Sequence, residues 1–291
     1  MRIAHSADYS DRVSSTPADS LLKPIAQWPV HNASAAIVSA TGETIAAFGD
    51  CERVYELASV TKLLVSQAVL IAVEEGAIDL DTPAGPPGST VRHLLSHASG
   101  LDFDTAQVRD QPGVRRIYSS AGYQLLADTV QSATDIRFAD YLGEAVCVPL
   151  GMESTALVGP AGHGVRSSVE DLARLAAELL EPRLISPQLH AERISVQFPG
   201  LDGFVPGYGR QRPNDWGLGP ELRDGKHPHW TAASHSPRTF GHFGQAGTFL
   251  WVDPDLGAAC VVLTDRPFGA WAKPLWSDFN DDVVRGLHNI H

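Results

Sequence analysis

The sequence has little cysteine, and its cysteines are not arranged to form a disulfide framework or a zinc site. Its 291 residues include three cysteines, Cys51, Cys147 and Cys260, which are far apart in the sequence, and no two of them form a CxxC motif. An odd number of isolated thiols fits reduced, structural cysteines better than disulfide bonds or metal ligands. We therefore expect no metal site, and nothing in the sequence indicates a cofactor.

Long apolar runs and blocks of basic residues are also missing. The most apolar stretch, Leu63 to Val73, has eleven residues, whereas a membrane-spanning helix needs about 20. The first twenty residues lack the apolar core of a secretory signal. The formal net charge is −12, and no basic block could neutralise a phosphate backbone. These absences predict a cytoplasmic protein with no membrane or nucleic-acid partner, and they leave the oligomeric state open.

Two common enzyme signatures are absent as well. The sequence contains neither a GxSxG motif nor a glycine-rich phosphate-binding loop, which removes the α/β-hydrolase and P-loop alternatives. Hydrophobic residues make up 43% and charged residues 19% of the chain, values that are typical of a folded globular protein. The length corresponds to about two domains at roughly 150 residues each.

Strand patterns occur only near the two ends of the chain, and helical periodicity dominates between them. Strands are expected within residues 35–48, 249–252 and 258–264; helices are expected over 60–75, 120–133, 137–146, 168–180 and 275–287; and Pro199 to Gly225 is expected to form long loops. This order predicts an α+β fold in which an antiparallel sheet from both termini is flanked by helices, with a mostly helical region inserted.

The same order predicts how the chain divides. We expect a flexible segment over residues 1–20, a sheet domain formed by 21–75 plus 230–291, a mostly helical domain over 76–229, and a cleft between the two domains.

Two serines precede a lysine by three residues, a spacing that puts both side chains on one face of a helix. A lysine desolvated in a cleft can lose its proton and then accept the proton of the serine hydroxyl. In the pair Ser20/Lys23 the lysine precedes Pro24, which disfavours helical backbone, whereas Ser59 opens a long helical run that contains Lys62. Only Ser59 is therefore placed to act as a nucleophile.

The residues around this pair, and three later segments, resemble a known family. The segments are 56–62 (ELASVTK), 73–81 (VEEGAIDLD), 91–101 (VRHLLSHASGL), 118–126 (YSSAGYQLL) and 241–248 (GHFGQAGT). Their order and spacing resemble the serine β-lactamase and penicillin-binding-protein superfamily, in its class C and esterase branch. The resemblance extends over about residues 35–265 and implies the β-lactamase/transpeptidase-like fold.

The resemblance also implies a role for each matching residue. Ser59 would be the acylated nucleophile and Lys62 the base that activates it. Tyr118 would shuttle protons, with a pKa depressed by Lys62, and either residue could be the base in deacylation. The backbone N–H groups of Ser59 and Gln245 would form the oxyanion hole, and Gly244 would let its strand approach the substrate closely.

Two residues depart from the pattern of the superfamily. Ser120 stands where the tyrosine motif usually has asparagine, and a hydroxyl replaces only part of the hydrogen bonding of an amide. His242 stands where penicillin-acting members have lysine, and a mostly neutral imidazole holds a substrate carboxylate less firmly. Both departures favour uncharged esters over β-lactams and peptides.

Three functions follow as hypotheses. The leading one is a serine hydrolase, an esterase that acts on small esters through an acyl-enzyme on Ser59. The second is a β-lactamase or D-amino-acid peptidase. Taken together, these two hypotheses predict a small-molecule ester or amide as substrate. The third is a catalytically silent relative that binds a ligand, because Ser120 departs from the pattern.

Other prominent side chains are expected to be structural. His93 and His97 are four residues apart, but no HExxH motif or third ligand accompanies them, and His227 and His229 lie on one proline-containing loop. Four aromatic residues are as consistent with the core as with an acyl pocket: Trp216, Trp230, Trp251 and Phe243.

Overall fold

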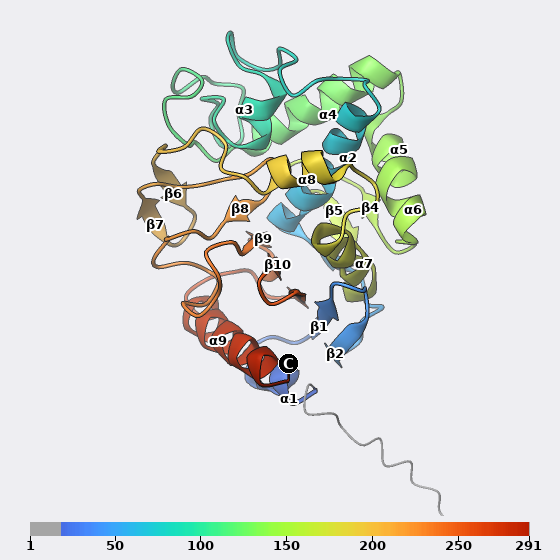
Figure 1. Cartoon of the computed structure of the whole chain (residues 1–291), viewed down its shortest axis with the longest axis vertical. Helices are drawn as coiled ribbons and strands as arrows, with labels where there is room; N and C mark the ends of the chain where they lie inside the picture. Colours follow the sequence, from blue (N-terminus) through green and yellow to red (C-terminus); the bar gives the residue numbers. More distant parts are fainter. Residues whose placement is uncertain (1–18, 291) are drawn as a thin grey trace, which may run out of the picture.

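Strands from both ends of the chain meet in one six-stranded antiparallel sheet of order β2-β1-β11-β10-β9-β8. The structure is a computed structural model, and it describes residues 19–290. The strands are β1 (Ala33–Ser39), β2 (Thr44–Phe48), β8 (Glu221–Leu222), β9 (Phe240–Gly244), β10 (Thr248–Asp253) and β11 (Ala258–Thr264). The predicted α+β fold, with its terminal hairpins and antiparallel sheet, is confirmed. Figure 1 shows α9 and α1 below this sheet and the other helical layer above it.

The remaining elements surround the sheet. Short strands form a three-stranded sheet and a hairpin: β3 (Tyr55–Glu56), β4 (Ala156–Leu157), β5 (Val165–Ser167), β6 (Gly203–Val205) and β7 (Gly209–Gln211). The α-helices are α1 (Asp19–Leu22), α2 (Thr61–Glu74), α3 (Val91–Leu95), α4 (Ser120–Thr134), α5 (Phe138–Leu142), α6 (Val148–Leu150), α7 (Val169–Leu180), α8 (Pro187–Arg193) and α9 (Ala272–Ile290). Two 3-10 turns, η1 (Lys23–Gln27) and η2 (Ala58–Val60), and a π-helical turn, η3 (Gly143–Cys147), complete the chain.

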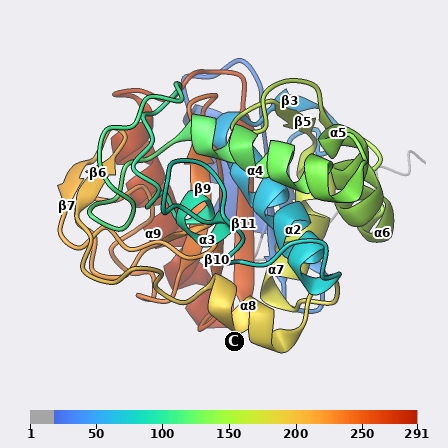
Figure 2. The same cartoon turned by 90° about the horizontal axis from the view of Figure 1, so that it is seen from above.

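Both faces of the sheet are buried, and each packs in its own core. Side chains alternate along a strand, so Val261 and Leu263 of β11 pack in the core that α2, α4 and α7 share, whereas Cys260 and Val262 pack in the core that includes α9. A strand covered on both faces reads as a continuous apolar run, as β11 does. In Figure 2, α2 and α4 lie side by side over the strands.

Helix α2 runs through the middle of the upper layer. Every side chain from Thr61 to Ala72 is buried, which explains why the segment is apolar on all sides instead of amphipathic. The turn η2, which precedes it, contacts β9 and β10. The first turn of α2 is therefore fixed against the sheet by its core packing.

The structure changes three local expectations. The helix predicted over 137–146 continues through η3 and α6 to Leu150, because the wide π-helical turn accommodates Pro149, and it ends at the left-handed Gly151. The region 199–225 was expected to be loops, yet it contains β6, β7 and β8. The flexible segment predicted over 1–20 lies outside the described residues except for Asp19 and Ser20, which begin α1.

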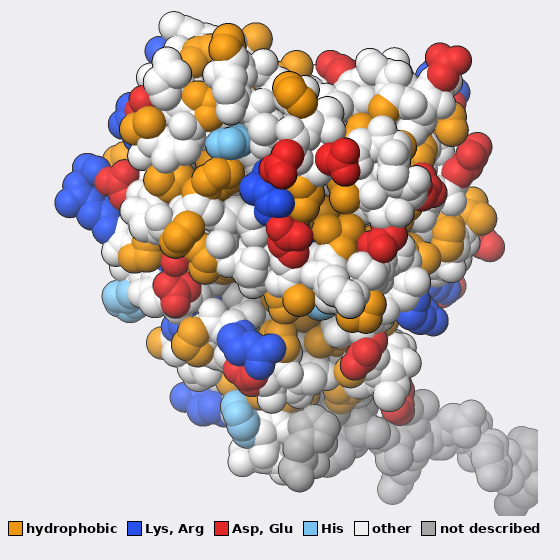
Figure 3. Space-filling view, turned by 45° about the horizontal axis from the view of Figure 1, so that its top comes forward, with side chains coloured by type: hydrophobic (Ala, Val, Ile, Leu, Met, Phe, Trp, Pro, Cys, Tyr) orange, Lys and Arg blue, Asp and Glu red, His pale blue; other side chains and the backbone are white. Residues whose placement is uncertain are grey.

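Helix α7 packs on β1 and β11, so part of the predicted helical region 76–229 lies against the sheet; the domain boundaries themselves stay a prediction. Within residues 19–290, no helix has the length and apolar composition that a membrane span requires. The face in Figure 3 carries acidic and basic side chains interspersed, without a large area of one charge.

Candidate active site

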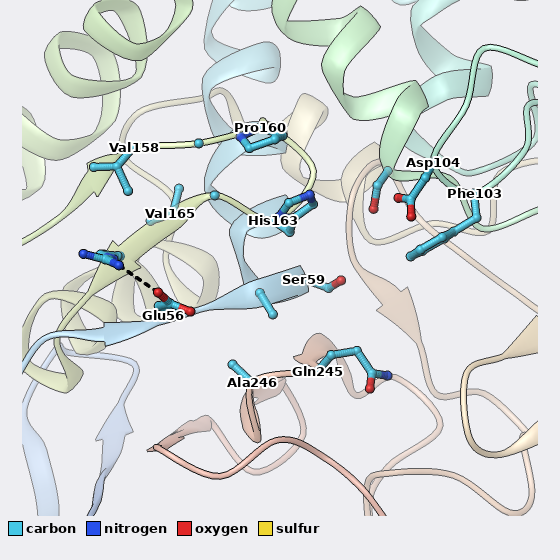
Figure 4. A pocket seen from close by; sticks show the side chains of 15 residues that line it. Glu56, Ser59, Phe103, Asp104, Val158, Pro160, His163, Val165, Gln245 and Ala246 are labelled. Carbon is cyan, nitrogen blue, oxygen red and sulfur yellow. Dashed lines mark hydrogen bonds and ion pairs between the residues drawn. The ribbon is translucent and has the colours of Figure 1, made fainter.

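Ser59 lies in the turn η2, directly before α2. The preceding residue, Ala58, has a left-handed backbone with φ of 46°, a conformation that is uncommon outside glycine and is found where the surroundings impose it. Figure 4 shows Ser59 directed into a cavity of about 480 Å³. The strained turn thus presents the hydroxyl to open space, while α2 behind it is rigid.

Lys62 follows one turn later and is completely buried. Its Nζ donates to the carbonyl of Gly162 at 2.7 Å and to Ser120 Oγ at 3.2 Å, and it lies 3.4 Å from Ser59 Oγ. Because a neutral amine keeps two N–H donors, these can serve Gly162 and Ser120 while the lone pair faces the Ser59 hydroxyl. The geometry suits proton transfer from Ser59 to Lys62.

The protonation of Lys62 follows from its surroundings. Burial disfavours the ammonium and lowers the pKa of Lys62 to about 7, and the carboxylate of Asp104 opposes this shift. A large fraction of the lysine is therefore the free amine near neutral pH. The predicted desolvation of this side chain agrees with its environment in the structure.

Tyr118 lies on the loop just before α4, and its hydroxyl is 3.3 Å from His242 Nε2. Burial lowers the pKa of His242 to about 3, so the ring is neutral. Its Nδ1 is 2.7 Å from the carbonyl of Phe243, which can only accept, so Nδ1 carries the proton and Nε2 is an acceptor. Tyr118 therefore donates its hydroxyl proton to His242.

The expected pKa of Tyr118 is corrected by this environment. The sequence suggested that Lys62 depresses it, but burial raises the pKa of Tyr118 far above its ordinary value, and the neighbouring Ser59 hydroxyl only partly offsets that rise. The Lys62 Nζ lies over the face of the ring, 4.6 Å from its centroid, and not beside the hydroxyl. Tyr118 is a neutral phenol, which can relay a proton but does not serve as a phenolate base.

The two backbone N–H groups that the sequence assigned to an oxyanion hole are unbonded within residues 19–290. Within the described part of the chain, the N–H groups of Ser59 and Gln245 donate to no acceptor, and both residues line the cavity. Gly244 acts differently from the expectation: a Cβ there would lie 2.3 Å from the carbonyl oxygen of Leu57. The absence of a side chain lets this turn approach the nucleophile turn, not the substrate.

A second, more enclosed cavity of about 240 Å³ meets the first at Ser59 and Gln245. Its wall is mainly aromatic and is formed by Phe103, Tyr118, Trp216 and Phe243 together with Pro206, Glu221 and His242. The other two tryptophans considered, Trp230 and Trp251, are buried in the core beside α9. Ser59 thus stands between a larger, more open cavity and a smaller, more enclosed one with a mainly aromatic wall.

The role of Gly162 could not be predicted from the sequence, because this residue contributes only its carbonyl oxygen, which accepts from Lys62 Nζ. Nor did the sequence reveal how His97 holds Tyr118. The His97 carbonyl accepts from Ile117 N at 2.9 Å, its Nδ1 accepts from Ser119 N at 3.1 Å, and its ring packs on Tyr118 with centroids 4.5 Å apart. His97 therefore brackets Tyr118 on both sides. Within residues 19–290, no three side chains of the metal-binding types cluster.

Replacing His97 tests this bracket. His97→Ala removes the acceptor for Ser119 N, so kcat for an ester is expected to fall about 10- to 100-fold while KM changes less than about threefold. Asparagine tolerates the left-handed φ of 58° found at His97 and supplies an acceptor oxygen. Most of the kcat should therefore return in His97→Asn. An equal loss of kcat in both variants, or a change confined to KM, would show that His97 does not position Tyr118.

The protonation states predict a pH profile. The kcat/KM for an uncharged ester should rise with pH through an apparent pKa of about 7, as Lys62 loses its proton. No descending limb is expected below about pH 9.5, because the pKa of Tyr118 is raised. Stopped-flow or steady-state rates between about pH 5 and 9.5 check this. A decline through about pH 8 or 9 would mean that a required neutral acid, such as the Tyr118 phenol, loses its proton there, contrary to its raised pKa.

The chain matches the family model described as Beta-lactamase over residues 33–284. The crystal structure of a beta-lactamase from Mycobacterium bovis is similar, with a TM-score of 0.90 and 54% identity, covering 92% of this chain and 99% of that one. EstCE1, described as a hydrolase with promiscuous acyltransferase activity, has a TM-score of 0.74 at 17% identity, covering 92% and 97% of the two chains, which supports the fold alone.

A curated relative matches only in part. Penicillin-binding protein 4* of Bacillus subtilis is 28% identical over 134 residues, which are 35% of this chain and 30% of that protein. The matched region thus spans less than a third of the relative.

Proposed function

This chain belongs to the beta-lactamase family of serine hydrolases, and from that premise we propose that it is an esterase that hydrolyses small esters through an acyl-enzyme on Ser59. The proposal rests on Lys62, which is buried, has a pKa of about 7 and lies 3.4 Å from Ser59 Oγ. Burying a lysine costs stability, so a completely buried amine beside a serine favours a functional role over a structural one. Its use here is to activate the serine.

Acylation follows from the contacts. The free amine of Lys62 takes the Ser59 proton as Oγ attacks the ester carbonyl, and the N–H groups of Ser59 and Gln245 stabilise the oxyanion. When the tetrahedral intermediate collapses, the C–O bond to the alcohol breaks and the alcohol leaves with a proton from Lys62. Tyr118 can relay this proton, because its hydroxyl is a neutral donor and acceptor.

Deacylation uses the same base. Lys62 is a free amine again once the alcohol has left, so it can remove a proton from a water molecule that attacks the acyl carbonyl. The water oxygen bonds to the carbonyl carbon, the bond to Ser59 Oγ breaks, and Lys62 returns the proton to the serine. Of the two candidate bases, the neutral Tyr118 is the weaker choice because burial raises its pKa.

The preference for esters rests on His242 and Ser120. A neutral His242 offers no positive charge to a substrate carboxylate, which β-lactams and peptide C-termini carry. Ser120 Oγ accepts a hydrogen bond from Lys62 Nζ at 3.2 Å and keeps a single O–H donor for a substrate carbonyl, where an asparagine amide would offer two N–H donors. Esters also need less leaving-group activation than amides.

A β-lactamase is the second candidate, favoured by the 54% identical protein from M. bovis that is described as one. A catalytically silent protein is disfavoured by the amine of Lys62, 3.4 Å from Ser59 Oγ, and, within the described chain, by two unbonded backbone N–H groups, those of Ser59 and Gln245, at one cavity. The test compares kcat/KM for p-nitrophenyl butyrate with that for a chromogenic cephalosporin. We expect the ester to be favoured by at least about 10²-fold. A higher kcat/KM for the cephalosporin would favour the second candidate, and no turnover of any ester would overturn the proposal.

A further inference from the structure

Asp104 stands on the wall of the cavity beside Ser59, on the loop between α3 and α4. Its side chain is exposed, and Figure 4 shows the carboxylate directed toward the space around Ser59, next to the ring of Phe103. The Phe103 side chain is 46% exposed and lines both cavities. A carboxylate and an accessible aromatic ring thus share one side of the nucleophile.

This carboxylate is unpaired, whereas its acidic neighbours are not. Asp102 binds Arg109 at 2.7 Å and Asp110 binds Arg115 at 3.0 Å. Within residues 19–290, Asp104 has neither a hydrogen bond nor an ion pair. The nearby arginines are thus already neutralised, and the charge of Asp104 is not.

The other charged side chains around the nucleophile also have partners. On the wall of the open cavity, Glu56 and Arg166 pair with each other at 2.7 Å. On the wall of the enclosed cavity, Glu221 lies 3.1 Å from the buried Lys226.

The remaining groups add no free positive charge. Lys62 is fully buried and directs its donors to Ser120 and Gly162, and His242 is neutral. His163, the imidazole on the opposite wall, is the one further ionisable group facing the open cavity among residues 19–290. Apart from this imidazole, the uncompensated charge around Ser59 is therefore the single negative charge of Asp104.

We propose that Asp104, together with the ring of Phe103, forms a subsite for a positively charged substrate group, so that the enzyme selects ammonium-bearing esters and rejects carboxylate-bearing ones. This inference rests on the proposed esterase function and specifies its substrate class. An ammonium is attracted both by a carboxylate and by the face of an aromatic ring. A substrate carboxylate in the same place would be repelled by Asp104 and would find no free cation.

Boronic acids test the subsite without turnover. The boron accepts the Ser59 oxygen to form a tetrahedral adduct, and the serine proton passes to Lys62. Three matched probes differ in charge: 3-(aminomethyl)phenylboronic, 3-(hydroxymethyl)phenylboronic and 3-carboxyphenylboronic acid. With calorimetry at about pH 8, above the usual range of imidazole titration, the cationic probe should bind about tenfold more tightly than the anionic one. The ratio should shrink as salt is raised.

Two variants assign the ratio to one residue. In Asp104→Asn the ratio should fall to about twofold or less, and Asp104→Glu should keep most of it. Asp79→Asn is the matched control, because Asp79 is also an exposed carboxylate but lies beyond the far end of α2; its ratio should equal that of the parent. A parent that binds all three probes equally, or a ratio that survives in Asp104→Asn, overturns the subsite alone. Failure of every probe to bind Ser59 overturns the proposed function, and the subsite with it.

Discussion

Lys62→Met is expected to reduce kcat/KM for an uncharged ester by about 10³-fold or more, because the substitution removes the amine that lies 3.4 Å from Ser59 Oγ. Tyr118 is a neutral phenol whose pKa is raised by burial, and the pKa of His242 is about 3. Methionine is close to lysine in length and apolar character, so α2 should keep its packing. Initial rates with p-nitrophenyl butyrate measure the loss.

The same substitution has a pH-dependent effect on stability. The folded parent holds Lys62 with a pKa of about 7, whereas an unfolded lysine keeps its proton up to about pH 10. Between these values the unfolded state binds more protons, so the stability of the parent rises with pH. Relative to Lys62→Met, the parent should gain about 2 to 3 kcal/mol in free energy of unfolding from pH 7 to pH 9.

Denaturant titrations at several pH values check this, and Lys23→Met is the control. Lys23 is exposed and belongs to the other serine-lysine pair of the sequence. Its replacement should leave both the rate and the pH dependence of unfolding close to those of the parent. If Lys62→Met and the parent keep a constant difference in stability across this pH range, Lys62 is not the depressed base that the geometry requires.

Gly244→Ala should have the second-largest effect. An added Cβ would lie 2.3 Å from the Leu57 carbonyl oxygen and 2.5 Å from Thr248 Oγ1, and Thr248 already donates to that carbonyl at 2.8 Å. The turn must therefore move away from η2, and the N–H of Gln245 moves with it. Loss of one oxyanion donor costs about 10²- to 10³-fold in kcat, and the strain should lower the free energy of unfolding by about 1 to 3 kcal/mol.

Gly143→Ala provides the matched comparison. Gly143 lies in a helical turn, and a Cβ there meets nothing within 4 Å, so its replacement should be neutral or stabilise by up to about 1 kcal/mol. Activity should be unchanged in this variant. If Gly244→Ala retained the kcat of the parent in a folded state, the amide of Gln245 would not belong to the oxyanion hole.

Much of this fold could be predicted because its elements are strongly patterned. The hairpin of β1 and β2 and the helices α4 and α7 follow from local periodicity, and Ser119 and Ser168 cap those two helices through Gly122 N and Asp171 N. The segment 199–225 was harder, since β6 to β8 are two or three residues long and such strands carry no detectable period.

The site divides in the same way. Ser59 and Lys62 could be found from their spacing on one helix, a local property. The pKa of Tyr118 could not, because its direction depends on burial by distant segments and on the placement of Lys62 over the ring instead of the hydroxyl. The contact of Lys62 with the Gly162 carbonyl could not be predicted, because a backbone carbonyl is present at every residue and does not depend on side-chain identity.

Ser59 is expected to carry the acyl group, and intact-mass spectrometry after rapid mixing with p-nitrophenyl butyrate and acid quenching detects that adduct. The parent should gain the mass of one butyryl group within the first turnover, peptide mapping should locate the group on Ser59, and Ser59→Ala should gain none. A butyryl adduct on another residue, or equal ester hydrolysis by Ser59→Ala, would contradict this assignment.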